Sequence, residues 1–274
     1  MTMPHSEEIQ KANQEGRLIP FVGSGFSKPL GLPDWRGLIA QVAEKVGYES
    51  DLFFLHGSYP QLLEYLSRYH QHEWNEFVHN MTVKFDSEDA VQKRKKSPTH
   101  IALTQLNVKT IYTTNYDTHI ESCLRDSGKC VREYASLADF VRAEDKSIEC
   151  EVIKFHGTLV DPSTLVLTES QYFDRMSLEE AVDQRLRSDL LSNSFLFMGY
   201  SFNDTNIRYI WYKINKLKSL QNRASGFTLR PSYFVTFGNE PIQSELLKKW
   251  DIITINLDPV DPTNSLADFL NQIK

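Results

Sequence analysis

The sequence predicts an α/β fold, a Rossmann-like doubly wound parallel sheet with a helical insertion. Short apolar runs typical of buried strands alternate along the chain with segments of helical periodicity. Four of these runs end in Gly, Ser, Asn, Asp or His, at the position where a doubly wound sheet binds its ligands. One stretch, residues 51 to about 96, is helical throughout and interrupts the alternation.

The first elements form a helix, a strand and a second helix. Residues 6–17, SEEIQKANQEGR, predict a helix with Ser6 as its N-cap and Gly16 as its stop. The apolar residues 19–22 predict the first strand, and a glycine-rich turn follows. Residues 34–47, DWRGLIAQVAEKVG, carry apolar side chains at helical spacing and end in Gly47, a C-cap residue.

The insertion has two features with alternative interpretations. Its final charge run, Lys93 to Lys96, is most simply a solvated helix end rather than a patch for phosphate or nucleic acid. Its aromatic side chains predict an assembly surface, although core packing explains them equally well. These aromatic residues are Phe53, Phe54, Tyr65, Tyr69, Trp74 and Phe77.

Strands and helices alternate again after the insertion. The remaining predicted strands are residues 108–117, 150–157, 194–201, 231–238 and 250–259. Helical segments lie between most of them, including residues 177–193 and 203–220. We therefore expect residues 1–274 to form a single domain around one parallel sheet.

Composition excludes several classes of protein. The 274 residues include 30 Lys and Arg against 36 Asp and Glu, and the net charge of −6 argues against direct nucleic-acid binding by the chain as a whole. Three cysteines without a C-x-x-C pair predict neither a disulfide framework nor a four-cysteine zinc site. The first residues lack the apolar core of a signal peptide, and no apolar run reaches about eighteen residues. We expect a cytoplasmic protein that does not enter a membrane.

The glycine-rich turn lies in residues 18–39, LIPFVGSGFSKPLGLPDWRGLI. Glycines after a first strand allow main-chain N–H groups to approach a phosphate, and a following helix points its positive end at the same group. The spacing does not complete G-x-G-x-x-G, because the glycine after Gly23 and Gly25 is Gly31, and no P-loop lysine follows. By itself, the pattern fits a plain strand-to-helix turn at least as well.

The polar residues that follow the predicted strands should converge on one crevice. Asn115 and Asp117 stand where a strand passes into a helix, so capping alone explains them as well as ligand binding does. His156 is either a satisfied turn residue or a base, since an imidazole titrates near neutrality. The complete set is Gly23, Ser24, Gly25 and Ser27; Thr114, Asn115 and Asp117; His156 and Gly157; Gly199, Tyr200, Ser201 and Asp204.

These residues resemble the motifs of the sirtuin family. Residues 23–36, GSGFSKPLGLPDWR, are similar to the family fingerprint G-A-G-x-S…G-I-P-D-F-R. The segments TTNYD, FHG and GYSFNDTNI follow in the order that the family has, and IITINLDP resembles its strand near the C-terminus. The resemblance covers the core from about residue 18 to 258, without the insertions.

The resemblance implies that the chain binds NAD, and it assigns roles residue by residue. The phosphate loop corresponds to Gly23, Ser24, Gly25 and Ser27, and an adjoining segment to Asp34 and Arg36. The nicotinamide ribose and carboxamide correspond to Asn115 and Asp117, with Thr114 beside them, and the catalytic histidine to His156. The adenosine side corresponds to Gly199, Tyr200, Ser201 and Asp204, with Asn256 and Leu257 near the adenine ribose.

Two departures from the family change the expected reaction. Protein-deacylating sirtuins hold a structural zinc with two C-x-x-C pairs after the catalytic histidine, but no cysteine follows Cys150 here, so no metal is expected. The acyl-lysine platform is also unrecognisable. Its replacement, LTESQYFD, resembles the bacterial sirtuin-like domains of anti-phage defence, which look like NAD hydrolases. The expected reaction is cleavage of NAD to nicotinamide and ADP-ribose.

In the expected mechanism, water replaces the acyl oxygen as nucleophile. Asn115 would orient the water or the ribose, His156 would act as base or ribose-hydroxyl partner, and Asp117 would hold the nicotinamide end. Two alternatives stay open: a non-catalytic sensor of NAD or ADP-ribose, and a zinc-less deacylase or ADP-ribosyltransferase. A harmful hydrolase needs an off state, so we expect a homo-oligomer and a separate regulatory partner such as a DNA-translocase-type ATPase.

Overall fold

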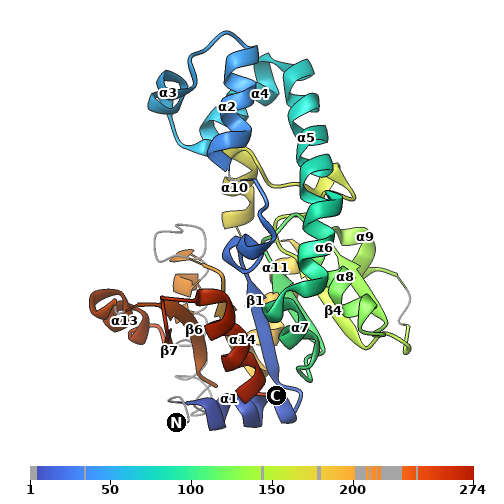
Figure 1. Ribbon diagram of the computed structural model, residues 1–274, viewed down its shortest axis with the longest axis vertical. Coiled ribbons are helices and arrows are strands. Elements are labelled where there is room, and N and C mark those ends of the chain that lie inside the picture. The colour runs from blue at the N-terminus through green and yellow to red at the C-terminus, as the bar shows by residue number, and fades with distance from the viewer. Residues whose placement is uncertain are drawn as a thin grey trace.

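The protein contains a parallel seven-stranded sheet with helices on both faces (Figure 1). The structure is a computed structural model that describes residues 5–33, 35–142, 145–177, 180–200, 208–209, 211–213, 215–216, 230–238 and 240–274. The strand order is β3-β4-β2-β1-β5-β6-β7, and every neighbouring pair is parallel. The predicted doubly wound α/β fold is therefore confirmed.

Six of the strands lie within the predicted apolar runs, and one was not predicted. The strands are β1 Leu18–Val22, β2 Thr110–Thr113, β3 Val131–Tyr134, β4 Cys150–Lys154, β5 Ser194–Met198, β6 Ser232–Phe237 and β7 Ile252–Leu257. The missed strand is β3, which lies at the edge of the sheet. Its sequence, VREY, is short and half polar, and only Tyr134 is buried.

The described helices overlap the predicted segments 6–17, 34–47, 51–96 and 177–193, and further helices were not named from the sequence. Most of the predicted segment 203–220 lies outside the described residues. The described helices are α1 Ser6–Gln14, α2 Trp35–Lys45, α3 Ser50–Phe53, α4 Tyr59–Tyr69, α5 Gln71–Phe85, α6 Glu88–Lys96, α7 Pro98–Thr104, α8 His119–Asp126, α9 Leu137–Phe140, α10 Glu169–Met176, α11 Ala181–Ser192, α13 Pro241–Lys248 and α14 Pro262–Gln272. Ser6 is not an N-cap as predicted, because His5 takes that position and Ser6 is the first helical residue. No helix in the described ranges is long and apolar enough to cross a membrane.

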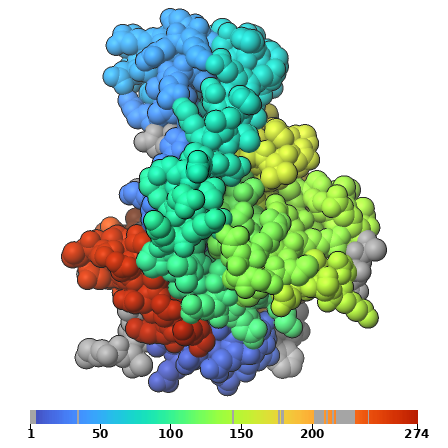
Figure 2. Space-filling model, turned by 45° about the vertical axis from the view of Figure 1, so that its right-hand side comes forward, coloured from blue at the N-terminus to red at the C-terminus, as the bar shows by residue number. Residues whose placement is uncertain are grey.

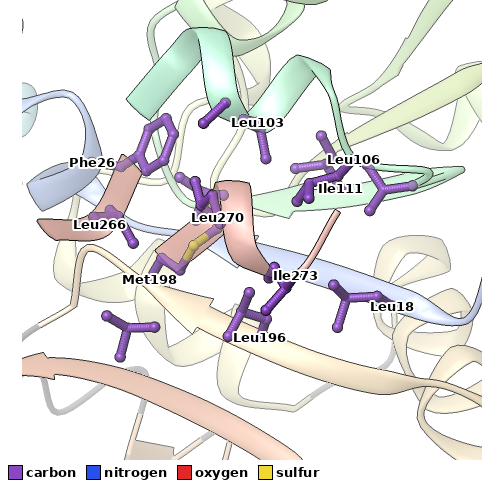
Figure 3. Close-up of a cluster of buried hydrophobic side chains, with 14 of the residues drawn as sticks. Leu18, Phe26, Leu103, Leu106, Ile111, Leu196, Met198, Leu266, Leu270 and Ile273 are labelled. Carbon is purple, nitrogen blue, oxygen red and sulfur yellow. The ribbon is translucent and has the colours of Figure 1, made fainter. Parts of the chain in front are cut away.

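Each face of the sheet buries its own hydrophobic cluster. One cluster packs strand residues against α1, α7, α8 and α14, and includes Leu18, Leu103, Met198 and Leu270 (Figure 3). The cluster on the other face packs Phe21, Phe197 and their neighbours against α11 and Trp211. Alternate residues of β1 thus point to opposite faces, as the pleat of a doubly covered strand requires.

The insertion helices build a third cluster beyond the sheet. Helices α2, α4 and α5 share a core with Tyr116, Leu159 and Leu165, which follow β2 and β4 in the chain. Figure 1 shows these helices at the end of the molecule towards which β1 points, and Figure 2 shows them as a projecting lobe. Of the insertion aromatics, Phe53 and Phe77 are buried in this core, whereas Tyr69 is 72% exposed.

A buried ion pair joins β4 to the turn after β2. Lys154 is the last residue of β4, and its Nζ is 2.9 Å from Oε1 of Glu121 on α8, with both side chains fully buried. The same ammonium donates to the backbone oxygen of Asp117 at 2.5 Å. Burial raises the pKa of the Glu121 carboxyl, and the charge of Lys154 opposes that rise. A buried ion pair is tolerated only when such partners compensate its desolvation.

Replacing one member of this pair should destabilise the protein more than replacing both. The variant Lys154→Met leaves the Glu121 carboxyl without its ion-pair partner and the Asp117 carbonyl without its donor. We expect the free energy of unfolding to fall by about 3–5 kcal/mol. The double variant Lys154→Met/Glu121→Leu removes the buried carboxylate as well and should recover most of that loss. Urea unfolding of the two single variants and the double variant measures this coupling. Strictly additive losses would contradict it.

Candidate functional site

Polar residues follow four adjacent strands at one edge of the sheet. Strands β4, β2, β1 and β5 are neighbours, and because they are parallel their carboxyl ends lie together. The chain leaves β1 towards β2 on one side and later adds β5 on the other. The gap between the ends of β1 and β5 is thus the topological switch point, where open α/β sheets bind ligands.

The glycines after β1 pack against the turn after β5. A Cβ atom on Gly23 would lie 2.7 Å from the carbonyl oxygen of Gly199 and 2.6 Å from the ring of Tyr200. The N–H of Gly25 donates to the same Gly199 oxygen at 2.9 Å, and Gly199 itself has φ +76°. The bare backbone is therefore required for two loops to touch, whether or not a phosphate also binds there.

Tyr200 closes the space between β1 and β2. Its hydroxyl donates to the backbone oxygen of Val22 at 3.0 Å and lies 3.0 Å from Oγ1 of Thr114. Its ring meets Phe21 edge-on, with 5.9 Å between centroids. Thr114 and Tyr200, both predicted from the sequence, are thus brought together at the switch point.

Asn115 is buried at the end of β2 with one unsatisfied atom. Its Nδ2 donates to Oγ of Ser27 at 3.1 Å, which joins the β2 end to the glycine-rich turn. Its Oδ1 has no hydrogen-bond partner among the described residues, although the side chain is only 4% exposed. An unsatisfied buried amide oxygen costs roughly 1–3 kcal/mol, and a hydroxyl or water donor from a ligand would remove that cost.

Asp117 lies just before the helix that follows β2. Its Oδ1 accepts the backbone N–H of His119, the first residue of α8, at 3.0 Å. The N-cap position belongs to Thr118, so neither Asn115 nor Asp117 is the N-cap, although Asp117 satisfies one N–H group at the start of the helix. The carboxyl is 2% exposed, and its backbone oxygen is held by Lys154, so the segment from Asn115 to Asp117 is fixed from both sides.

His156 lies just beyond β4 and is held neutral by its surroundings. The side chain is 6% exposed, and the ring of Tyr172 meets it edge-on at 5.2 Å between centroids. Burial, and then the nearby charge of Arg175, lower the pKa of His156 to about 3. The imidazole is therefore neutral at pH 7 and can accept a hydrogen bond from a ligand.

Arg175 and Tyr172 were not singled out from the sequence. Both lie on α10, and the guanidinium of Arg175 stacks over Phe155 at 4.4 Å, directly before His156. Arg175 donates to both carboxylate oxygens of Asp183 on α11, at 3.0 and 3.1 Å. No sequence pattern around Tyr172 or Arg175 indicates that they lie near His156. Lys154 could have been singled out, because it is a lysine within the apolar run predicted as the strand 150–157.

Several residues that the sequence assigned to the NAD site lie away from Asn115, Asp117 and His156, or outside the residues that the structure describes. The Arg36 guanidinium donates to Asp51 at 2.6 Å and stacks on Phe54, so it faces the insertion. Asn256 and Leu257 end β7, three strands from β1, or about 14 Å at the usual strand spacing. The Leu257 side chain is buried in the core. Asp34, Ser201 and Asp204 lie outside the described residues.

Comparison with known proteins gives one family and several curated relatives. Residues 109–255, more than half of the 274-residue chain, match the SIR2-like domain. An "NAD(+) hydrolase ThsA" of Acinetobacter baumannii (strain 532279) is 28% identical over 275 residues, covering 97% of this chain and 55% of the relative. The protein of the same name from Enterococcus faecium is 26% identical over 286 residues, covering 98% and 57%.

A third relative is named for defence. The "Defense-associated sirtuin 2" of Bacillus subtilis is 24% identical over 252 residues, covering 88% of this chain and 23% of that protein. The chain thus spans little more than half the length of the ThsA relatives and about a quarter of the third.

The turn after His156 should tolerate no side chain at Gly157. Gly157 has φ +82°, and a Cβ atom there would lie 2.0 Å from the carbonyl oxygen of Thr164. We expect Gly157→Ala to lower the free energy of unfolding by roughly 2–5 kcal/mol, through backbone strain and overpacking together. Gly128→Ala is the control, because Gly128 has φ +91° but nothing within 4 Å. Equal losses in urea unfolding would mean that the Thr164 contact is unimportant.

Acid should destabilise the fold through its buried histidines. Burial lowers the pKa of His156, and likewise of His100 on α7, to about 3, below the ordinary histidine value of about 6.5. The unfolded chain therefore binds more protons below pH 6.5, so stability is full above that pH and is lost as the pH falls towards 3. Between pH 7 and 5 we expect a loss of about 2 kcal/mol per histidine. The variant His156→Asn has no imidazole at this position, so its free energy of unfolding should fall less between pH 7 and pH 5 than that of the wild type. Urea unfolding at each pH measures this difference.

Proposed function

The chain belongs to the SIR2-like domain family, and from this premise we propose that it is an NAD hydrolase that releases nicotinamide and ADP-ribose. The observation that carries the proposal is the buried, unsatisfied Oδ1 of Asn115 at the end of β2, next to the switch point of the sheet. The name of the ThsA relatives supports the same activity. The neutral His156 on the neighbouring strand supplies a second group for the reaction.

The proposed NAD orientation follows from the order of the strands. A dinucleotide that crosses the switch point between β1 and β5 meets Gly23, Ser24, Gly25 and Ser27 with its phosphates. Its nicotinamide end then lies towards β2 and β4, near Asn115, Asp117 and His156. Its adenosine end lies towards β5, near Gly199 and Tyr200, and the proposal extends that side to Ser201, Asp204, Asn256 and Leu257.

The proposed reaction breaks the bond between the ribose C1′ and the nicotinamide nitrogen. Nicotinamide leaves with the bonding electrons, positive charge develops on the ribose, and the oxygen of water bonds to C1′ and releases a proton. Groups that hold the ribose and the leaving carboxamide in place lower this barrier, because the charge appears only in the transition state. Asn115 orients the water or a ribose hydroxyl through Oδ1, and Asp117 faces the nicotinamide end.

The role of His156 follows from its low basicity. An imidazole with a pKa of about 3 is neutral at pH 7 but binds a proton weakly, so it is better suited to accept a hydrogen bond from a ribose hydroxyl than to remove a proton outright. The hydroxyl becomes more acidic as positive charge develops on the ribose. The His156 hydrogen bond therefore strengthens in the transition state.

We also propose a biological role for this activity. The chain acts as an effector of anti-phage defence in the bacterial cytoplasm, a role that the name of the Bacillus subtilis relative supports. Because unregulated NAD loss would harm the host, the activity is controlled by a homo-oligomer and by a separate partner such as a DNA-translocase-type ATPase. The reaction needs no metal.

Removing either central side chain should abolish turnover. Purified protein is incubated with NAD, with and without the product of the neighbouring gene, and nicotinamide and ADP-ribose are quantified by chromatography. We expect His156→Ala and Asn115→Ala to lower the rate at least 100-fold, the usual contribution of such groups. His79→Ala, at an exposed position of α5, is the matched control and should keep full activity.

The controls separate loss of catalysis from loss of folding. Thermal unfolding and NAD binding are measured for each variant, and His156→Gln and Asn115→Asp serve if an alanine variant fails to fold. Full activity in the His156 or Asn115 variants would disprove the assignment. Binding of NAD without turnover in the wild type, with and without the neighbouring protein, would favour a non-catalytic sensor.

A further inference from the structure

A hollow lies at the opposite ends of the strands from the candidate NAD site. It has a volume of about 970 Å³ and is lined by Leu18 and Thr110, the first residues of β1 and β2, together with residues of β3, β4, α9 and α11. These are amino ends of strands, whereas the candidate NAD site lies at carboxyl ends. None of the residues assigned to NAD lines the hollow.

The hollow exists because one connection lacks a full helix. A parallel connection normally returns through a helix that covers the sheet. Between β3 and β4, the described residues contain only the four-residue helix α9. Polar residues of the strands, Glu151 and Arg132 among them, are therefore left facing the space between α9 and α11.

A fixed hydrogen-bond network forms one wall. The guanidinium of Arg185 donates to Asp189 at 3.1 Å and to Glu151 at 2.8 Å. The hydroxyl of Tyr112 donates to Asp189 and that of Tyr134 to Glu151, each at 2.8 Å. Both carboxylates are thus satisfied within the protein, and the wall is rigid without a ligand.

Positive charge is in excess in this hollow, although the chain as a whole is acidic. Among the described lining residues, the cations are Lys109, Lys129, Arg132, Arg142, Lys146 and Arg185, against four carboxylates. The two carboxylates outside the network also have donors: Asp145 accepts from Ser147, and Glu149 from the backbone of Cys130. By contrast, the ammonium groups of Lys109 and Lys146 make no hydrogen bond or ion pair with another described residue, and both side chains are exposed. A concave site with surplus cations concentrates anions.

We propose that this hollow binds a small phosphate-bearing anion at a site separate from the NAD site. Its volume is that of a small-molecule pocket, and its cations come from several segments that converge on one space. The rings of Tyr134 and Phe140 pack at 4.8 Å and line one side, which offers a stacking surface for a flat ring. The ligand class is therefore an organic phosphate, with the lysines and arginines on the phosphate oxygens.

The experiment uses inorganic tripolyphosphate as probe and isothermal titration calorimetry on the full chain. The variant Lys109→Glu/Lys146→Glu reverses two exposed charges in the hollow, and we expect it to weaken binding at least tenfold. Lys95→Glu/Lys96→Glu makes the same change of net charge on exposed positions of α6, outside the hollow, and should leave the affinity unchanged. Exposed positions are chosen so that the variants keep their fold.

Further controls separate this site from the proposed NAD site. His156→Ala should bind tripolyphosphate as the wild type does, even where it loses NAD hydrolysis. Equal weakening in the α6 control would mean non-specific charge attraction and would overturn the proposal. So would the absence of wild-type binding, or competition for the anion by NAD. If the Lys109/Lys146 variant changes only the oligomer size in sedimentation, the hollow is an interface between copies and the proposal is wrong.

Discussion

The arrangement of the candidate site depends on the buried ammonium of Lys154. Lys154 ends β4, two residues before His156, and its ammonium binds both the Glu121 carboxyl and the backbone oxygen of Asp117. The strand that carries His156 is thereby locked against the turn that carries Asn115. A charge in the core is costly without partners, so the two must stay in register for the fold to be stable. The same interaction thus serves stability and the geometry of the site.

The glycines at the switch point are needed for the packing of two loops, and under the proposed function they also leave room for the NAD phosphates. Gly23, Gly25 and Gly199 let two loops pack backbone to backbone, and Tyr200 seals the contact. Asn115, which donates to Ser27 of this turn, is buried, and hydrogen bonds are strong in such an environment. The Asn115 oxygen is left unsatisfied in the same environment. Under the proposed function, its missing partner is supplied by the ribose or the attacking water.

The two ends of the strands differ in how far their polar side chains are buried. At the carboxyl ends, Asn115, Asp117 and His156 are buried, and His156 is uncharged there. At the amino edge, the short connection from β3 to β4 leaves cations around an open hollow. An NAD hydrolase with both features would have separate places for its substrate and for a second phosphate compound, so the two could be bound independently.

The sequence by itself determined the parallel sheet and the residues at its carboxyl ends, because strand periodicity is local and parallel strands bring their ends to one edge. It also carried the motifs that identify the family. Only the tertiary structure revealed β3, whose half-polar sequence resembles a loop, and placed the Arg36 side chain against the insertion rather than at the phosphate loop. It alone paired Arg175 with Asp183 and Lys154 with Glu121. Those partners belong to different elements, and packing between elements leaves no periodic trace in the chain.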